Sequence, residues 1–217
     1  MARSKSSGAW LARHVSDPYV RKAGAQGYRA RSAFKLIEIV NSEGLARPGE
    51  TVVDLGAAPG GWSQVLAKRV GASGKVVAVD PLEVDAIPGV TFIQGDFRED
   101  EVLKRLEAAL EGRKVDLVVS DMAPNISGVR ATDQARSIHL CELALDFART
   151  HLNPRGAFVV KVFQGSGYPE FLVEMKRAFV TVASKKPGAS RDESREMYLW
   201  GKGLRMAGRG REGKEGS

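Results

Sequence analysis

The stretch TVVDLGAAPGGWSQVLAKRV, residues 51–70, decides the fold. An apolar run ends in Asp54, and a loop of small residues follows over 56–61. From residue 61 onward the apolar positions recur at helical spacing. A strand, a tight turn and a helix in this order are typical of the first unit of a nucleotide-binding α/β fold.

Length and composition bound the kind of protein. The chain has 217 residues, of which 43% are hydrophobic, enough for one globular domain with a full core. No apolar run approaches the ~18–20 residues that span a bilayer, so we expect a soluble, cytoplasmic protein without a membrane partner. The single cysteine, Cys141, suits a reducing compartment and falls in an apolar helical pattern, where a buried thiol is expected.

The net charge of +7 is concentrated at the two ends of the chain. Residues 1–40 hold eight Lys and Arg against Asp17 and Glu38, whereas the middle of the chain is close to neutral. Clustered cations displace counterions from phosphates, so a polyanionic partner is expected, although basic ends also serve solubility. We divide the chain into a basic N-terminal arm (1–30), a globular domain (31–202) and a Gly- and Arg-rich tail (203–217) that we expect to be disordered.

Strand-like runs and helical patterns alternate along the globular domain. The strands are expected at 51–55, 75–80, 90–95, 115–120, 156–163, 179–185 and 196–201. The helices are expected at 30–43, 61–70, 99–111, 133–151 and 168–178. This alternation predicts a Rossmann-like, mostly parallel, seven-stranded sheet with helices on both faces. The segment 186–196 is too short for a helical crossover, so the last two strands are expected to form an antiparallel hairpin.

The loop after the first strand departs from the patterns that bind phosphates. Gly56 and Gly61 match the outer glycines of a dinucleotide fingerprint, but Ala58 stands at the middle position and Pro59 follows it. The chain also lacks the Gly-Lys-Ser/Thr ending of a P-loop. We therefore expect a nucleotide cofactor without a pyrophosphate at this loop.

Acidic residues end three successive strands of the predicted sheet: Asp54, Asp80 and Asp96. Carboxylates repel a pyrophosphate and favour a cation, so this set suits S-adenosylmethionine better than NAD. Taken singly each acid is an ordinary loop or cap residue, and Asp96 in particular is a candidate cap for the next helix. Trp62 either contacts the cofactor or packs under the sheet. The predicted cofactor contacts are Asp54, Gly56, Gly60, Gly61, Trp62, Asp80, Asp96, Phe97 and Asp121.

The fourth and fifth strands carry the candidate reaction chemistry. The fourth ends in SDMAPN, which contains neither the D/N-P-P-Y pattern of amino-methylating enzymes nor the Pro-Cys pair of pyrimidine C5 chemistry. The fifth strand, FVVKVF, places Lys161 among apolar residues. A buried lysine is unfavourable unless it is paired, and Asp121 at the end of the neighbouring strand is its expected partner. The alternative is an edge lysine whose amine reaches solvent.

These residues resemble a known family. Lys35 in SAFKLIEI, Asp121, Lys161 and Glu196 in SREMYLW are similar to the Lys-Asp-Lys-Glu tetrad of the FtsJ-type ribose 2′-O-methyltransferases. DLGAAPGGWSQ resembles the cofactor loop of that family, and residues 10–36 resemble the N-terminal region of its bacterial ribosomal-RNA members. The resemblance implies S-adenosylmethionine as cofactor and a uridine in the A-loop of 23S rRNA, within the large ribosomal subunit, as target. The tail after Lys202 and the pair Asp192-Glu193 depart from the pattern, which leaves substrate docking open.

A ribose 2′-hydroxyl must lose its proton as it accepts a methyl group, and Lys161 is the candidate base. Because an ordinary lysine is protonated at neutral pH, two mechanisms stay open. A neutral Lys161 removes the proton, or a charged Lys161 orients the hydroxyl and stabilises the developing alkoxide. No metal is expected, because the three histidines and Cys141 form no ligand pattern.

Basic and aromatic residues of the first 40 positions are candidates for RNA contact, with Trp10, Tyr19 and Tyr28 available to stack on bases. The predicted RNA-binding residues are Arg21, Lys22, Arg29 and Arg31. The alternative is that the aromatic residues pack this segment onto the domain. We expect a monomeric enzyme acting on rRNA. A relative acting on tRNA and a non-catalytic RNA-binding module are the competing interpretations, and the complete tetrad disfavours the latter.

Overall fold

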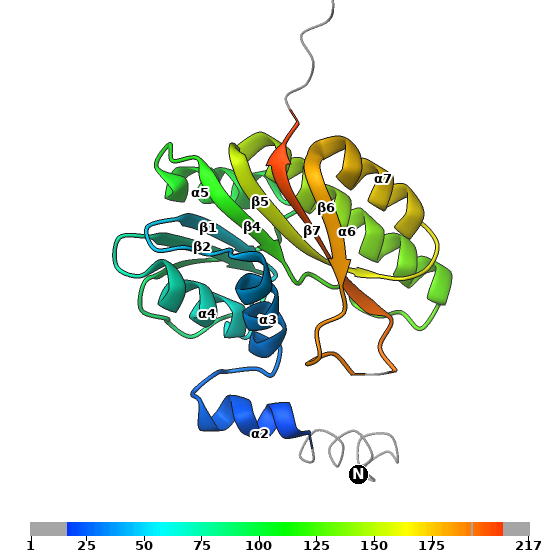
Figure 1. Cartoon of the computed structure of the whole chain (residues 1–217), viewed down its shortest axis with the longest axis horizontal. Helices are drawn as coiled ribbons and strands as arrows, with labels where there is room; N and C mark the ends of the chain where they lie inside the picture. Colours follow the sequence, from blue (N-terminus) through cyan, green and yellow to red (C-terminus); the bar gives the residue numbers. More distant parts are fainter. Residues whose placement is uncertain (1–16, 192, 206–217) are drawn as a thin grey trace, which may run out of the picture.

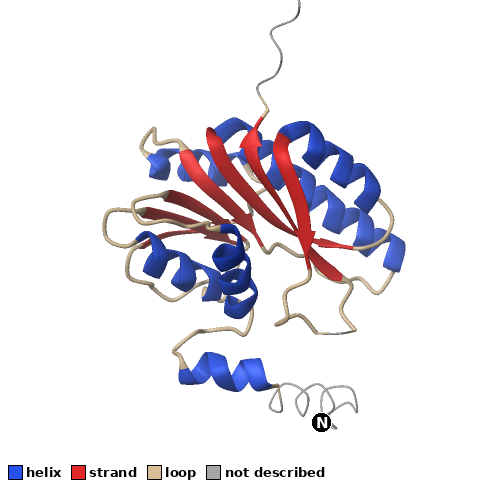
Figure 2. Cartoon of the chain, viewed as in Figure 1, coloured by secondary structure: helices blue, strands red, loops and turns tan. Residues whose placement is uncertain are grey.

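The computed structural model describes residues 17–191 and 193–205 and is built around one twisted sheet (Figure 1). Helices lie on both faces of this sheet (Figure 2). The seven strands are β1 (Thr51–Leu55), β2 (Lys75–Asp80), β3 (Val90–Gln94), β4 (Val115–Ser120), β5 (Leu152–Phe163), β6 (Phe179–Lys185) and β7 (Glu196–Leu204). The helices are α2 (Pro18–Ala25), α3 (Ala33–Glu43), α4 (Gly61–Val70), α5 (Asp100–Leu110), α6 (Arg130–His151) and α7 (Tyr168–Ala178). Among the described helices, none is long and apolar enough to cross a membrane.

The strand order is β3-β2-β1-β4-β5-β7-β6. The first five strands in the chain run parallel, whereas β7 is antiparallel to both β5 and β6. The predicted sheet and its antiparallel final pair are thereby confirmed. Because β7 is inserted between β5 and β6, residues of β5 and β7 lie opposite one another. Lys161 lies opposite Tyr198, and Phe163 lies opposite Glu196.

Alternation along the strands divides the core into two layers. Phe158 and Val160 of β5 face α5, α6 and α7, whereas Ala157 and Val159 face α3 and α4. Residue 161 therefore belongs to the face covered by α3 and α4. On β7, Tyr198 and Trp200 also point to this face. The fold thus brings Lys161 and the even-numbered positions of β7 under α3.

The strand order reverses at β1, because β2 lies on one side of this strand and β4 on the other. In open α/β sheets, ligands bind beyond the carboxyl ends of the strands at such a point. Gly56, directly after β1, has a φ of +82°, and a Cβ there would lie 2.8 Å from Met122 in the loop after β4. A glycine is therefore required where the two loops approach each other.

Helix α2 was not among the elements predicted from sequence. Pro18 occupies its first turn, where a missing N–H is tolerated, and the side chain of Asp17 accepts a hydrogen bond from Tyr19 N at 2.9 Å. The helix is attached to the domain by aromatic packing, because the rings of Tyr19 and Tyr28 each lie 5.7 Å from that of Phe34. Both tyrosines therefore pack the segment onto the domain. Gly203 and Leu204 belong to β7, so the predicted start of the tail at residue 203 is too early. Trp10 and residues 206–217 lie outside the described residues.

Candidate active site

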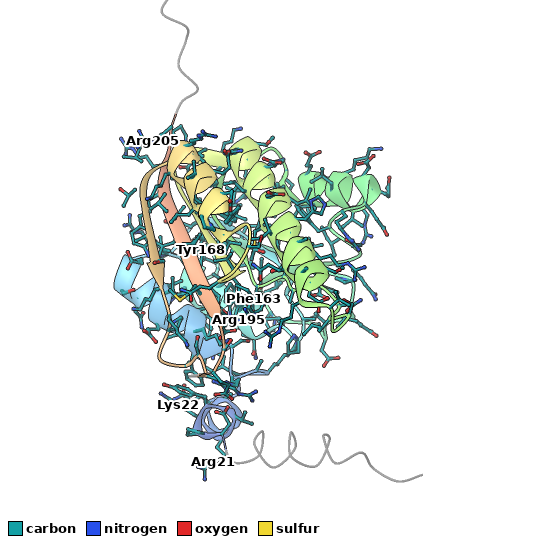
Figure 3. All side chains as sticks on the ribbon, turned by 90° about the vertical axis from the view of Figure 1, so that its right-hand side faces the viewer. Arg21, Lys22, Phe163, Tyr168, Arg195 and Arg205 are labelled. Atoms are coloured by element: carbon teal, nitrogen blue, oxygen red, sulfur yellow. The ribbon has the colours of Figure 1, made fainter. Side chains whose placement is uncertain are left out.

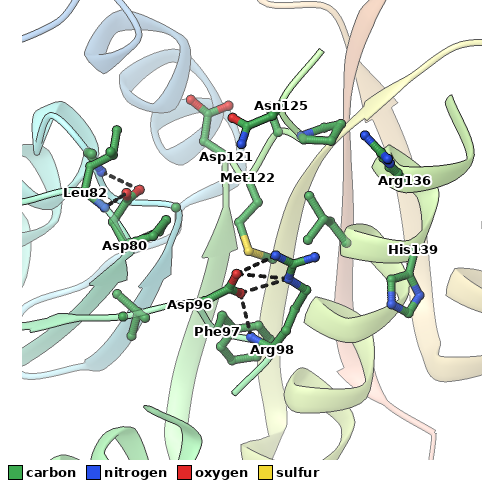
Figure 4. Close-up of a pocket in the computed structure, with 18 residues that line it drawn as sticks. Asp80, Leu82, Asp96, Phe97, Arg98, Asp121, Met122, Asn125, Arg136 and His139 are labelled. Atoms are coloured by element: carbon green, nitrogen blue, oxygen red, sulfur yellow. Dashed lines mark hydrogen bonds and ion pairs between the residues drawn. The ribbon is translucent and has the colours of Figure 1, made fainter. Parts of the chain in front are cut away.

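A cavity of about 690 Å³ opens at the carboxyl ends of β1, β2, β3 and β4 (Figure 4). We call it the larger cavity. Its wall consists of the four loops that follow these strands and of one side of α6. Its lining residues include Gly56, Asp80, Asp96, Phe97, Asp121 and Asn125. The cavity thus lies where the strand order predicts a ligand.

Asp80 is fixed on the wall of the larger cavity by backbone amides. Its two carboxylate oxygens accept hydrogen bonds from Ala58 N at 3.0 Å and from Leu82 N at 2.8 Å. Each oxygen keeps a lone pair free for a further donor, since a carboxylate accepts about four hydrogen bonds. Asp80 is therefore placed to accept hydrogen bonds from hydroxyl groups of a ligand.

Asp96 does not cap the following helix, because α5 begins at Asp100 with Glu99 as its N-cap. Its carboxylate instead pairs with Arg98, whose Nε lies 2.9 Å from Oδ1 and 3.1 Å from Oδ2 (Figure 4). Hydrogen bonds from the Arg98 side chain hold the pKa of Asp96 below its usual value. Phe97 packs edge-on against Phe147, with 5.6 Å between ring centroids. The arginine therefore fixes the orientation and the charge of Asp96.

Asp54 is fully buried behind the larger cavity and is absent from its lining. Its Oδ2 accepts a hydrogen bond from Ser63 Oγ at 2.6 Å, whereas its Oδ1 has no partner among the described residues. Burial raises the pKa of Asp54 to about 7; the Ser63 hydrogen bond opposes this shift, and the carboxylates of Asp121 and Asp80 add to it. A cation bound near Asp54 would therefore stabilise its ionised carboxylate.

Trp62, Gly60 and Gly61 pack inside the domain and do not line the larger cavity. The indole N–H of Trp62 donates to Ser32 O at 2.9 Å, and its ring lies 5.7 Å from that of Tyr198. A Cβ on Gly60 would lie 2.7 Å from Ile87, and one on Gly61 would lie 3.3 Å from Ala30 Cβ. These two glycines therefore allow neighbouring segments to pack against the loop.

Lys161 and Asp121 form a paired group beside the larger cavity. Lys161 Nζ lies 2.9 Å from Asp121 Oδ1 and donates to the backbone oxygen of the same residue at 2.6 Å. The side chain of Lys161 is 10% exposed, so the pair is largely shielded from water.

The thiol of Cys141 donates to Lys161 O at 3.2 Å, and burial raises the pKa of this thiol to about 12. The cysteine is therefore an inert buried thiol, as its place in an apolar pattern predicts.

Lys35 and Glu196 form the second pair. Their side chains make an ion pair, and both line a hollow of about 350 Å³, which we call the smaller cavity. Its other lining residues are Arg31, Arg191, Glu193 and Ser194. Burial favours the neutral acid, but the hydrogen bond and charge of Lys35 hold the pKa of Glu196 below its usual value. Glu196 therefore carries its negative charge at neutral pH.

Tyr198 connects the two pairs and was missed by the sequence analysis. Its hydroxyl donates to Asp121 Oδ1 at 3.1 Å, and its ring centroid lies 5.9 Å from Lys35 Nζ. Burial, together with the negative charges of Asp121 and Glu196, raises the pKa of this phenol well above its usual value. The sequence contained a signal for this residue: positions 196 and 198 of a strand point to the same face, so Tyr198 is expected beside Glu196.

The four residues predicted as a tetrad are thus brought together from four elements, α3, the end of β4, β5 and β7. Asp121 lines the larger cavity, whereas Lys35 and Glu196 line the smaller one. The charged cluster therefore lies between two cavities, with Lys161 paired to Asp121. Such an arrangement can hold one molecule on each side of the charged cluster.

The predicted RNA-binding residues fall into two groups. Arg29 donates to Asp85 O at 2.8 Å and to Ala86 O at 3.0 Å, and Arg31 pairs with Asp17 and donates to Ala189 O. Both arginines therefore hold segments of the protein together. Arg21 and Lys22 are exposed on α2, below the domain in Figure 3.

Among residues 17–191 and 193–205 no cluster of three or more His, Cys, Asp or Glu is placed to hold a metal ion.

The fold and the site define a methyltransferase of the Rossmann-like class. The seven-stranded sheet has helices on both faces and an antiparallel final pair, and an acid-lined cavity lies where the strand order reverses. Comparison with known proteins gives the family. A family model described as FtsJ-like methyltransferase matches residues 28–204, and the chain belongs to this family. The resemblance seen in the sequence is thereby confirmed.

Individual relatives agree with this assignment. The chain is 59% identical over 205 residues to Ribosomal RNA large subunit methyltransferase E of Azoarcus sp. (strain BH72), covering 94% of this chain and 100% of the relative. It is 56% identical over 204 residues to the protein of the same name from Acinetobacter baumannii, covering 94% of each. A crystal structure from Plasmodium falciparum, assigned as a ribosomal RNA methyltransferase, superimposes with a TM-score of 0.74 at 31% identity, covering 82% of this chain and 98% of that one.

Proposed function

We propose that this protein transfers the methyl group of S-adenosylmethionine to the ribose 2′-oxygen of a uridine in 23S rRNA of the large ribosomal subunit. The observation that carries the proposal is the cluster of Lys35, Asp121, Lys161 and Glu196 between two cavities. The names of the bacterial relatives support rRNA of the large subunit as the substrate. The enzyme acts as a monomer in the cytoplasm.

The residues of the larger cavity fit S-adenosylmethionine. Asp80 offers carboxylate lone pairs to ribose hydroxyls, and Asp96, held by Arg98, offers an acceptor for the amino group of adenine. Phe97 supplies an apolar wall. Asp54 does not line the cavity, but its buried carboxyl group, with one unpartnered oxygen, favours a cationic ligand nearby and disfavours a pyrophosphate. When bound, this cofactor supplies a methyl group on a sulfonium, which is a good leaving group.

Lys161 binds and orients the 2′-hydroxyl of the acceptor nucleotide. The proposed mechanism uses the ammonium form of Lys161, the form that makes the ion pair with Asp121. In that form Lys161 donates a hydrogen bond to the 2′-oxygen, aligns a lone pair of this oxygen with the methyl group and stabilises negative charge as it develops. The proton of the hydroxyl passes to solvent water as the new oxygen–carbon bond forms and the methyl–sulfur bond of the donor breaks. Asp121, held by Tyr198, keeps Lys161 in place.

Lys35 and Glu196 hold the acceptor side of the site. Both line the smaller cavity, and Glu196 is ionised there because of Lys35. A carboxylate at this position accepts hydrogen bonds from ribose, and the lysine beside it attracts the phosphate backbone. The pair therefore orients the acceptor nucleotide toward Lys161.

Methyl transfer from radiolabelled S-adenosylmethionine tests the proposal. Large ribosomal subunits, protein-free rRNA and bulk tRNA are offered in parallel, with Lys161→Met as the inactive variant. Lys75→Met is a matched control, because Lys75 also forms a 2.9 Å ion pair, with Glu111, at the far end of β2. We expect label in large-subunit rRNA that is lost with Lys161→Met and kept with Lys75→Met. Label in tRNA alone, or equal activity of both variants, would contradict the proposal.

A further inference from the structure

The segment between β4 and α6 carries two exposed aliphatic side chains beside the larger cavity. Ile126 is 85% exposed and Val129 is 58% exposed. Asn125, the preceding residue, lines the cavity (Figure 4), and Asp121 of the tetrad lies a few positions earlier. The segment leads into α6 at the same edge of the sheet as α2 and the β6–β7 connection (Figure 1). We call residues 125–130 the apolar loop.

Asp133, in the first turn of α6, holds the apolar loop in one conformation. Its carboxylate accepts hydrogen bonds from Ser127 N at 2.8 Å, Ser127 Oγ at 2.7 Å and Gly128 N at 3.1 Å. The hydroxyl of Ser127 in turn accepts from Val129 N at 3.3 Å. The exposed side chains are therefore presented on a fixed turn, so that little conformational entropy is lost when a partner covers them.

Two arginines, Arg130 and Arg136, lie at or near the apolar loop, as does the negative charge of Asp133. Both arginines are exposed and neither makes a close ion pair among the described residues, although Arg136 lies on the wall of the larger cavity and is attracted by the charge of Asp133. Ile126 and Val129, close together on a fixed turn, offer a small apolar surface that a partner can cover. The combination of apolar contacts and unpaired cations matches a partner that offers flat apolar faces and phosphates together, which is single-stranded nucleic acid.

We propose that Ile126 and Val129 pack against unpaired bases of the RNA that flank the acceptor nucleotide, while Arg130 and Arg136 contact its phosphates. This inference rests on the proposed function, because it takes the RNA to be the molecule that enters the tetrad. The apolar loop then selects acceptor sites in unpaired regions, because a stacked and paired base has no free face to offer. Its contribution is to substrate binding and not to the chemical step.

Substitutions in the apolar loop test whether it contributes to substrate binding and not to the chemical step. Ile126→Ser and Val129→Ser are compared with Val180→Ser, which is a matched control because Val180 is 63% exposed on β6 at the opposite edge of the sheet. Covering about half of such a side chain corresponds to about a fivefold change in affinity. We expect the KM for large subunits to rise about fivefold for each loop variant. The kcat and the KM for S-adenosylmethionine are expected to stay at the wild-type values.

Filter binding to protein-free rRNA at one salt concentration identifies the partner. We expect weaker binding for both loop variants and unchanged binding for Val180→Ser. Loop variants that match Val180→Ser in both assays would overturn the inference. An effect on subunits without any effect on protein-free rRNA would also overturn it, because the loop would then contact a ribosomal protein. If the wild-type enzyme methylates none of these substrates, it is the proposed function that fails.

Discussion

Asp54 offers the sharpest test of the electrostatics of the site. It is fully buried, its Oδ1 has no partner in the described structure, and its pKa is raised from 3.8 to about 7. Asp54→Asn has nearly the same shape, and its amide oxygen can still accept the hydrogen bond of Ser63. The substitution therefore removes the buried negative charge with little change in packing.

The pH dependence follows from the sign of the shift. A carboxyl with a raised folded-state pKa binds its proton more tightly in the folded state, so stability falls as pH rises from the unfolded value toward the folded one. The loss is absent below about pH 3.8, grows by about 1.4 kcal/mol per pH unit and levels off above about pH 7. Its full size is about 4 kcal/mol, of which about 3 kcal/mol develops above pH 5.

Urea unfolding of the wild type and Asp54→Asn at about pH 5 and about pH 8.5 measures this difference. We expect the variant to gain about 3 kcal/mol relative to the wild type between these two pH values. Its affinity for S-adenosylmethionine, measured by calorimetry at about pH 8.5, where Asp54 of the wild type is ionised, is expected to fall, because the charge that favours a cation has been removed. A stability difference that is the same at both pH values would refute the reasoning.

Three further substitutions test single contacts. Arg98→Ala releases the Asp96 carboxylate, so we expect calorimetry to show about fivefold weaker binding of S-adenosylmethionine. The melting temperature is expected to stay unchanged, because the ion pair is exposed, and an unchanged affinity would contradict the prediction. Tyr198→Phe removes a donor to Asp121, and in the transfer assay we expect kcat to fall about tenfold at constant cofactor KM; an unchanged kcat would count against a positioning role. Arg31→Ala removes a hydrogen-bond donor from Asp17 Oδ2 and from Ala189 O, so we expect urea unfolding to show a loss of about 1–3 kcal/mol. Weaker RNA binding at full stability would support direct RNA contact instead.

Much of the fold follows from periodicity. The continuous apolar runs of β1, β4 and β5 mark strands buried on both faces, and the short segment before β7 excludes a helical crossover. Lys161 stood out because a lysine inside such a run needs a partner, and Asp121 is that partner. Helix α2 is harder to predict because it is short and begins with Pro18, a residue that breaks helices elsewhere but is tolerated in the first turn, here after the N-cap Asp17.

Contacts between distant segments could not be predicted from the sequence. Gly60 and Gly61 lie in a cofactor-like loop, but their space is filled by Ile87 and Ala30, which are far away in the chain. The charge of Arg31 suggested RNA, yet its partner at Ala189 is brought near only by the folded sheet. Composition shows which residues are charged, but whether a cation is already paired is decided by tertiary structure.

The position of the transferred methyl group tests the central claim most directly. Alkaline hydrolysis of RNA requires a free 2′-hydroxyl, so a 2′-O-methylated residue survives in an alkali-resistant dinucleotide. After reaction of large ribosomal subunits with radiolabelled S-adenosylmethionine, we predict that the label in the rRNA is recovered in such a dinucleotide, and that Lys161→Met gives none. Label recovered in mononucleotides, which would place the methyl group on a base, would contradict the account.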